Sequence, residues 1–155
     1  MSVVICCILA SIENVLFVNS VKLNWNKMRE KVRILVGYDF SLQSKKALTE
    51  AISIAKNFSG YIKVVNVYGK GMKEKAEVSI IEVKEVLNQE KVAYEVELIL
   101  GSDPAKILEK TAKKENFDIV AIGSRGLGNK ISILLGSVSR HVVTNAQCNV
   151  LVVKK

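Results

Sequence analysis

The sequence predicts a single α/β domain, doubly wound, with about five mostly parallel strands and with helices on both faces of the sheet. Two observations carry this prediction. Short runs rich in β-branched residues alternate with longer segments of helical spacing. Parallel neighbours need crossover connections, and because these are right-handed the helices cover both faces. The 155 residues, 49% of them hydrophobic and one of them proline, are enough for one buried core.

The strands are expected at the short apolar runs in which β-branched residues are frequent. In chain order, these runs are Val32–Gly37, Ile62–Val67, Tyr94–Leu100, Ile119–Ile122 and Val150–Val153.

Two helices are expected between the first three strands. The first follows Ser41, whose side chain suits an N-cap. Apolar residues then recur at helical intervals at Ala47, Leu48, Ala51, Ile54 and Ala55. A second, less regular helix is indicated by Val78, Ile81, Val83 and Val86.

Asp103 and Pro104 predict the start of a third helix, since aspartate caps a helix well and proline is favoured in the first turn. One face of this helix is expected to carry Ile107, Leu108, Thr111 and Ala112. A fourth helix is expected to begin near Gly136 and Ser137. Its inward residues are Val138, Val142 and Val143.

Residues 1–31 are expected to be an N-terminal apolar extension, and residues 32–155 the domain. The runs VVICCILA at 3–10 and VLFV at 15–18 are too short and too interrupted for a membrane span. No basic residue precedes them as in a secretory signal. A translation start at Met28 fits equally well. If the extension is translated, it needs cover from the domain, a partner subunit or a membrane surface.

The charge and the reactive residues exclude several function classes. The excess of 23 Lys and Arg over 15 Asp and Glu is scattered along the chain, which indicates a solvated surface rather than a nucleic-acid interface. The three cysteines show no metal-ligand spacing, so we expect a reducing, cytoplasmic setting and no metal. The single histidine, His141, argues against a catalytic triad and is expected to pack or face solvent.

A glycine-rich segment after the fourth strand is the best candidate for a site. Ligands of open parallel sheets bind beyond the carboxyl ends of the strands. Residues 123–137 read GSRGLGNKISILLGS there. Glycines allow the backbone to approach an anion, and the following helix N-terminus favours phosphate. The segment contains neither a Walker A motif nor the G-x-G-x-x-G fingerprint, so on these grounds alone a structural turn is an equal alternative.

The glycine spacing Gly123-x2-Gly126-x9-Gly136-Ser137 resembles the pattern of the ATP-binding branch of the universal stress protein family. Three further stretches are similar to this family: VGYDFS at 36–41, LLGSVS at 134–139 and NVLVVK at 149–154. The resemblance covers residues 33–155. It implies a Rossmann-like fold of the adenine nucleotide alpha hydrolase-like kind.

The resemblance also implies a nucleotide site. Asp39 is similar to the acidic residue that contacts the nucleoside, and Val67 to the position whose backbone meets adenine. The positions that hold ribose and phosphates correspond to Gly123, Gly126, Gly136, Ser137 and Val138. Arg125 adds charge in the same segment. Asp39 followed by Ser41 also fits plain helix capping, and Tyr38, where the family has other residues, would stack on a base or narrow the pocket.

The expected function is that of a cytoplasmic regulatory protein of the stress response that binds ATP, alone or with Mg²⁺, and is not an enzyme. The resemblance implies a homodimer through the last strand, Val150–Val153, and a protein partner of unknown identity, with no nucleic acid and no membrane. Two alternatives stay open. One is a nucleotide-free interaction module, and the other is a slow ATPase, for which Asp39 is the one carboxylate near the strand ends. ADP, AMP or a cyclic nucleotide are equally open as ligands.

Overall fold

The computed structural model describes residues 15–18, 31–125 and 135–154. The strands in this part are β1 (Val15–Val18), β2 (Arg33–Gly37), β3 (Tyr61–Tyr68), β4 (Ala93–Leu100), β5 (Ile119–Gly123) and β6 (Asn149–Val153). The helices are α2 (Leu42–Asn57), α3 (Lys73–Gln89), α4 (Pro104–Lys114) and α5 (Ser137–Asn145). Cys6, Cys7, Met28, Gly126 and the run at 3–10 lie outside the described residues.

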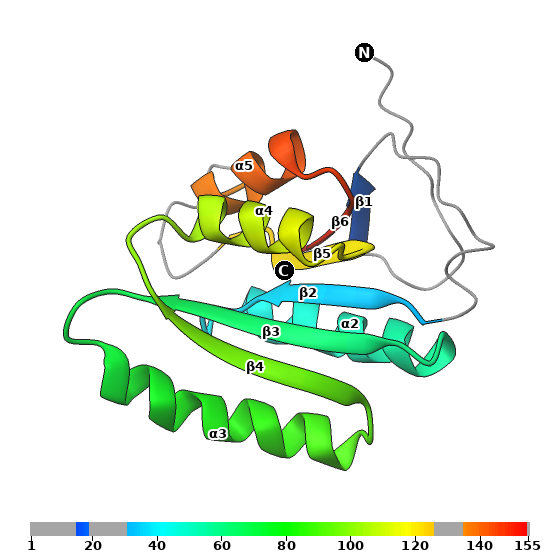
Figure 1. Ribbon diagram of the computed structural model, residues 1–155, viewed down its shortest axis with the longest axis horizontal. Coiled ribbons are helices and arrows are strands. Elements are labelled where there is room, and N and C mark those ends of the chain that lie inside the picture. Colours follow the sequence, from blue (N-terminus) through cyan, green and yellow to red (C-terminus); the bar gives the residue numbers. More distant parts are fainter. Residues whose placement is uncertain (1–14, 19–30, 126–134, 155) are drawn as a thin grey trace.

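The strands form one sheet in the order β1-β6-β5-β2-β3-β4 (Figure 1). Strands β2 to β6 are all parallel, which confirms the predicted fold class, and β1 is antiparallel to β6. The chain runs from β2 outward to β3 and β4 and then returns to the other side of β2 as β5. The strand order therefore reverses between β2 and β5, where Gly37 lies opposite Ile122.

Helices α2 and α3 cover one face of the sheet and α4 and α5 the other (Figure 1). The alternation of side chains along the strands supplies both core layers. In β2, Ile34 and Val36 belong to the layer under α2 and α3, and Leu35 belongs to the layer under α4. Complete burial of such side chains contributes about 1.5–3 kcal/mol each, so the three central residues of β2 anchor both layers.

The predicted helix starts are confirmed. The Ser41 side chain accepts a hydrogen bond from the Ser44 amide and caps α2. Asp103 accepts from the Lys106 amide and caps α4, with Pro104 as the first helical residue. His141 lies half-buried on α5, where its Nε2 is 2.7 Å from Glu109 Oε2 on α4. It therefore joins two helices, in agreement with a packing role.

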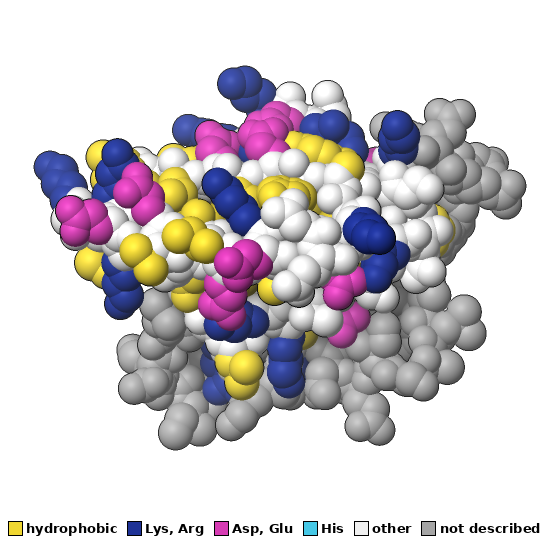
Figure 2. Space-filling model, turned by 90° about the horizontal axis from the view of Figure 1, so that it is seen from below, with side chains coloured by type: hydrophobic (Ala, Val, Ile, Leu, Met, Phe, Trp, Pro, Cys, Tyr) yellow, Lys and Arg dark blue, Asp and Glu magenta, His cyan; other side chains and the backbone are white. Residues whose placement is uncertain are grey.

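The predicted second helix is confirmed as α3, and of the four residues that indicate it, Val83 is buried. Val78 and Ile81 are 69% and 56% exposed, and Val86 is exposed as well. The buried residues of this helix are Ala76, Ile80, Val83 and Leu87. They follow the spacing i, i+4, i+7 and i+11 of one helical face. In Figure 2, which looks at the molecule from the α3 side, hydrophobic side chains lie among acidic and basic ones.

Strand β1 was not anticipated. From the sequence, the run VLFV at 15–18 is expected only as part of an apolar extension. In the structure these residues pair with β6, with Val15 opposite Val153 and Val18 opposite Val150. The sheet therefore gains a sixth strand from outside the predicted domain. The division of the chain at residue 32 itself stays a prediction.

A buried lysine lies on the α4 side of β3. Lys63 Nζ is 2.8 Å from Glu115 Oε1, 2.9 Å from Glu97 Oε2 and 3.1 Å from Glu95 Oε1. Burial works to lower the pKa of Lys63, but the hydrogen bonds to the three carboxylates outweigh it and the pKa is raised. This cluster joins β3, β4 and the end of α4.

Among the described residues, no helix has the length and apolar character needed to cross a bilayer.

Candidate functional site

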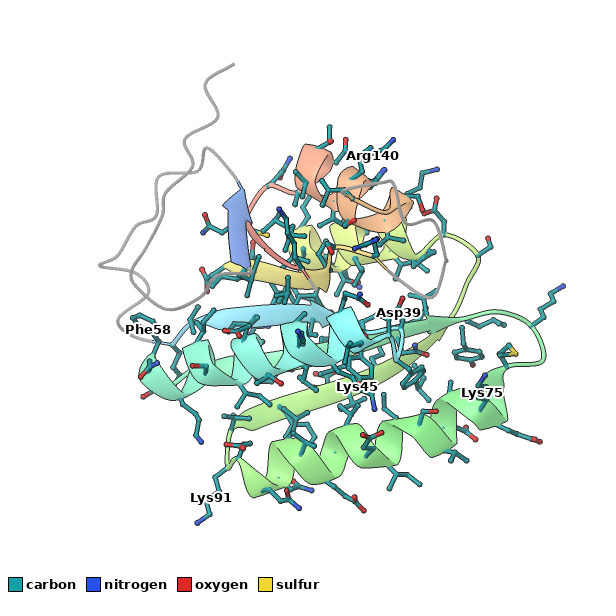
Figure 3. The ribbon with its side chains drawn as sticks, turned by 180° about the vertical axis from the view of Figure 1, so that it is seen from behind. Asp39, Lys45, Phe58, Lys75, Lys91 and Arg140 are labelled. Atoms are coloured by element: carbon teal, nitrogen blue, oxygen red, sulfur yellow. The ribbon has the colours of Figure 1, made fainter. Side chains whose placement is uncertain are left out.

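The candidate site lies where the strand order reverses, beyond the carboxyl ends of β2 and β5. Two segments follow these ends, residues 38–41 after β2 and residues 124–136 after β5. In Figure 3, Asp39 lies toward the end of the molecule at which α3 begins near Lys75, and Lys91 marks the opposite end. The structure thus places Asp39 at the edge where open parallel sheets bind ligands.

The Asp39 carboxylate has a fixed orientation. Its Oδ1 accepts hydrogen bonds from the Ser41 hydroxyl at 2.6 Å and from the Ser41 amide at 3.1 Å. Ser41, and not Asp39, provides the cap of α2. Oδ2 has no hydrogen-bond partner among the described residues. The contacts with Ser41 therefore account for one of the two carboxylate oxygens of Asp39.

The turn that carries Asp39 is tied to β3. Phe40 has a φ of 66°, a left-handed conformation that costs a non-glycine residue about 1–3 kcal/mol. Tyr38 opposes this cost through two bonds: its amide donates to the Val65 carbonyl at 3.0 Å, and its carbonyl accepts from Asn66 Nδ2 at 2.7 Å. By holding Tyr38 against β3, these bonds fix the position of the next residue, Asp39.

The Tyr38 ring is part of the core. It is 4% exposed and meets the Phe40 ring edge-on, with the ring centroids 5.2 Å apart. Burial, with smaller effects of Glu82 and Asp39, raises the pKa of Tyr38 to about 12. Of the two expectations for this tyrosine, stacking on a base therefore has no support in the structure.

Val67 presents backbone groups to the site. The ladder between β2 and β3 ends at Gly37 and Val65, after which the chain of β2 turns away. The Val65 carbonyl faces β2, because it accepts from the Tyr38 amide. Backbone groups alternate in direction along a strand, so the N–H and C=O of Val67 face the same way, beyond the end of β2. A donor and an acceptor thus stand side by side at the site.

Ser124 holds together the two ends of the glycine-rich segment. It is buried, and its amide donates to the Val153 carbonyl at 2.7 Å. Its carbonyl accepts from the Gly136 amide at 2.7 Å and from the Ser139 hydroxyl at 2.9 Å. The start of α5 is therefore fixed next to the end of β5. Arg125 follows Ser124 and is half-buried, whereas Gly126 lies outside the described residues.

Helix α5 begins without a side-chain cap. Its N-cap is Gly136, and the first turn contains no acidic residue. The amides of Ser137 and Val138 open the helix, where the partial positive charge of the helix dipole lies. Ser137 is exposed and Val138 is half-buried. The structure thus brings the predicted Gly136, Ser137 and Val138 to one place, a helix start suited to an anion.

Close packing requires glycine at only one of the two described glycines of the motif. A Cβ on Gly123 would lie 2.7 Å from Gln43 Cβ and 2.9 Å from the Gln43 carbonyl carbon, so the close approach of α2 requires glycine. A Cβ on Gly136 would meet nothing nearer than 3.6 Å, and its φ is −68°. Packing therefore explains Gly123 but leaves Gly136 unexplained.

Asn66 is a further polar residue at this edge of the sheet that was not predicted from the sequence. This side chain is 4% exposed, and its Nδ2 donates to the Tyr38 carbonyl. Its Oδ1 is buried and has no partner within the described residues. The available signal was a polar residue inside the apolar run IKVVNVY at 62–68. In the described part of the chain, no group of three or more His, Cys, Asp or Glu side chains is arranged to hold a metal ion.

In comparisons with known proteins, the part of the chain that matches a family is the predicted domain. The sequence profile of the Universal stress protein family matches residues 32–154. A universal stress protein of Methanocaldococcus jannaschii is 30% identical over 155 residues, which cover 88% of this chain and 89% of that protein. The solved structure of the hypothetical protein MJ0577 has a TM-score of 0.75 and 25% identity, covering 83% of this chain and 97% of that one.

Two similar structures were solved with nucleotides. One is a universal stress protein in complex with cAMP, with a TM-score of 0.65 and 20% identity over 79% of this chain and 96% of that one. The other, from Arabidopsis thaliana, has AMP bound, with a TM-score of 0.61 and 20% identity over 80% of this chain and 92% of that one. At these identities the likeness establishes the shared fold alone.

Proposed function

The chain belongs to the universal stress protein family, and from this premise we propose that it binds an adenine nucleotide where β2 and β5 end and acts as a nucleotide-dependent regulatory protein of the stress response. The nucleotide is ATP, alone or with Mg²⁺. The protein works in the cytoplasm by binding and is not an enzyme. Relatives solved with cAMP and AMP support adenine as the base.

The backbone of Val67 is the observation that carries this proposal. Its N–H and C=O lie side by side beyond the end of β2. The edge of adenine offers N1 as an acceptor next to the N6 amino group as a donor. A single residue can therefore bind this edge with two hydrogen bonds, whereas guanine offers a carbonyl and a ring N–H in the opposite order. The arrangement favours adenine over guanine.

The other end of the nucleotide is assigned to the start of α5. The amides of Ser137 and Val138 and the Ser137 hydroxyl are donors suited to phosphate oxygens. Gly136 leaves room for such a group to approach the backbone. Gly123, Gly126 and Arg125 complete the proposed phosphate segment, with Gly123 also needed for packing. Asp39 Oδ2 is proposed to accept from a ribose hydroxyl, since Ser41 binds Oδ1.

Regulation is proposed to act through the surface of residues 123–136. A bound phosphate changes what this segment presents to a protein partner, and a ligand shifts such a state by its differential affinity. The homodimer through β6 also belongs to this proposal. In the structure β1 occupies the free edge of β6, so this dimer requires the edge to be uncovered first.

The proposal is tested by calorimetric titration of the full chain with ATP, ADP, AMP, cAMP and GTP, with and without Mg²⁺. We expect binding of at least one adenine nucleotide and no binding of GTP. Gly136→Val should weaken binding more than about tenfold, since the branched side chain fills the space next to the phosphate. The control is Met72→Val, which places the same side chain at the N-cap of α3, another cap without a side-chain bond.

Each alternative function predicts a different outcome of these experiments. No binding of any adenine nucleotide by the folded parent would contradict the proposal and favour the nucleotide-free interaction module. Phosphate release from ATP above background, lost in Asp39→Ala, would favour the slow ATPase. Equal loss of binding in Gly136→Val and Met72→Val would remove the start of α5 from the site.

A further inference from the structure

The two edges of the sheet are protected in different ways. Strand β4 forms one edge and carries Glu95 and Glu97, both partly exposed and paired with Lys63. Charged side chains on an edge strand oppose pairing with another chain. Strand β6, at Asn149–Val153, has no charged residue and is fully apolar after its first position. Strand β6 would be the second edge of the parallel strands, but β1 pairs with it and is itself the edge strand.

The outward-facing groups of β6 can be identified from its bonds. The Asn149 amide donates to the Asp118 carbonyl, and the Val153 carbonyl accepts from the Ser124 amide. Both residues therefore face the β5 side. Because directions alternate along a strand, Val150 and Val152 face away from β5, toward β1. In β1 they lie opposite Val18 and Leu16, which are thus the residues that exchange hydrogen bonds with β6.

The covered edge is self-complementary. An antiparallel copy of β6 placed on a two-fold axis through Leu151 sets Val150 opposite the Val152 of the second copy, and both residues face outward. The N–H and C=O groups of Val150 and Val152, which β1 binds in the structure, would then be hydrogen-bonded to the second copy. The sequences VLFV in β1 and VLVV in β6 are alike in length, in apolar character and in the absence of charge.

We propose that β1 is a displaceable cap that occupies, within one chain, the position on β6 that fits the β6 of a second copy. The cap lies outside residues 32–154, the part that the family profile matches. Its one extensive contact with a described element is with β6. Displacing β1 therefore leaves the pairing of β2 to β6 intact while it exposes the pairing edge.

Membership of the same chain decides which occupant prevails. Because β1 and β6 belong to one chain, the effective concentration of β1 at β6 is on the order of 1 mM. At about 10 μM protein, β1 is thus favoured about a hundredfold over a second copy that pairs with equal strength. The full chain is monomeric under these conditions, and weakening β1 alone converts it into a dimer.

The test compares two double-proline variants of the full chain. Leu16→Pro, Val18→Pro removes both donors that face β6. The matched control, Val15→Pro, Phe17→Pro, places two prolines in the same strand at positions whose N–H groups face away from β6, which edge strands tolerate. Mass in solution is measured by light scattering, and amide exchange is measured at Val150 and Val152. Slow exchange at Ile34 and Val36 in β2 verifies that the domain is folded.

The expected result is a monomer for the parent and the control, with slow exchange at Val150 and Val152. Leu16→Pro, Val18→Pro is expected to be a dimer in which the same amides are protected and lose protection on dilution. A folded but monomeric variant with fast exchange there would overturn the proposal, as would disordered aggregation. A parent that is already a β6-paired dimer would overturn it too. If the prolines unfold the domain, Leu16→Gly, Val18→Gly is judged by the same criteria.

Discussion

The Tyr38 amide donates to the Val65 carbonyl at 3.0 Å, one residue beyond the end of the ladder between β2 and β3. This bond closes the sheet on that side and turns the chain of β2 away from β3. Everything on β3 beyond Val65 that faces the same direction is left without a neighbouring strand. Val67 therefore lies beyond the last pair of the ladder, and the bond fixes the start of the turn that carries Asp39.

Asn66 is predicted to keep this turn in place. Asn66→Ala removes the bond from Nδ2 to the Tyr38 carbonyl and leaves a buried acceptor unsatisfied, which costs about 1–3 kcal/mol of unfolding free energy. We also expect weaker nucleotide binding, since Asp39 loses its support. Chemical denaturation and titration measure both effects. Asn57→Ala, which removes a bond on the surface of α2, is the control and should change neither beyond experimental error.

Asp39 and Ser41 are predicted to separate ligand binding from helix capping. Ser41→Ala removes the cap of α2 and should cost about 0.5–2 kcal/mol of stability, with a smaller effect on nucleotide affinity. Asp39→Ala also removes Oδ2, the proposed ribose acceptor, and should lower affinity about tenfold or more. Thermal unfolding and titration of both variants decide the matter. If the two variants lose affinity equally, Asp39 acts only through the cap.

The sequence was sufficient for the fold because its local signals agree with the global arrangement. Ser41 and Asp103 cap the helices that they were expected to cap, and the apolar runs became parallel strands. Of the four residues that indicate α3, Val83 is buried, whereas Val78, Ile81 and Val86 are exposed. They locate the helix but not its buried face, because tertiary packing rather than residue type selects that face.

Other features depend on contacts between distant residues. The pairing of Val15–Val18 with β6 joins the two ends of the chain, and a run of four apolar residues contains no information about its partner. Lys63 is buried only because Glu95, Glu97 and Glu115 come from other elements. Asp39, Val67 and the glycine pattern were accessible through family resemblance, whereas the direction of the Val67 backbone required the sheet register.

Substitution by alanine is predicted to lower stability at Gly123 but to leave it unchanged at Gly136. Gly123→Ala places a Cβ 2.7 Å from Gln43 Cβ and 2.9 Å from its backbone carbon, so α2 must shift at a cost of about 1–3 kcal/mol. Gly136→Ala meets only ordinary contacts and should leave stability unchanged within about 0.5 kcal/mol. Denaturant unfolding of both variants tests this. A large loss of stability in Gly136→Ala would mean that the fold, rather than a ligand, requires this glycine.

The cluster around Lys63 is predicted to control the pH dependence of stability. Hydrogen bonds from Tyr61 and Lys63 lower the pKa of Glu95 in the folded state, so this carboxylate stabilises the fold at pH values above its unfolded pKa, and the contribution is lost as pH falls through the lowered folded pKa. Lys63 has the opposite sign. Its raised pKa stabilises the fold below the unfolded pKa of lysine and is lost only in strong alkali.

Lys63→Met tests this cluster. The Lys63 side chain is 6% exposed, but the three glutamates remain partly exposed, so we expect a loss of about 2 kcal/mol at neutral pH rather than the larger loss of a fully buried pair. Without the cation the carboxylates repel one another, so protonation relieves the variant, and its unfolding temperature should fall less than that of the parent from about pH 6 to pH 3. Lys45→Met, which breaks an exposed pair with Glu82, is the control and should follow the parent. Parallel pH profiles for Lys63→Met and the parent would show that the buried lysine contributes through packing of its aliphatic chain instead of its charge.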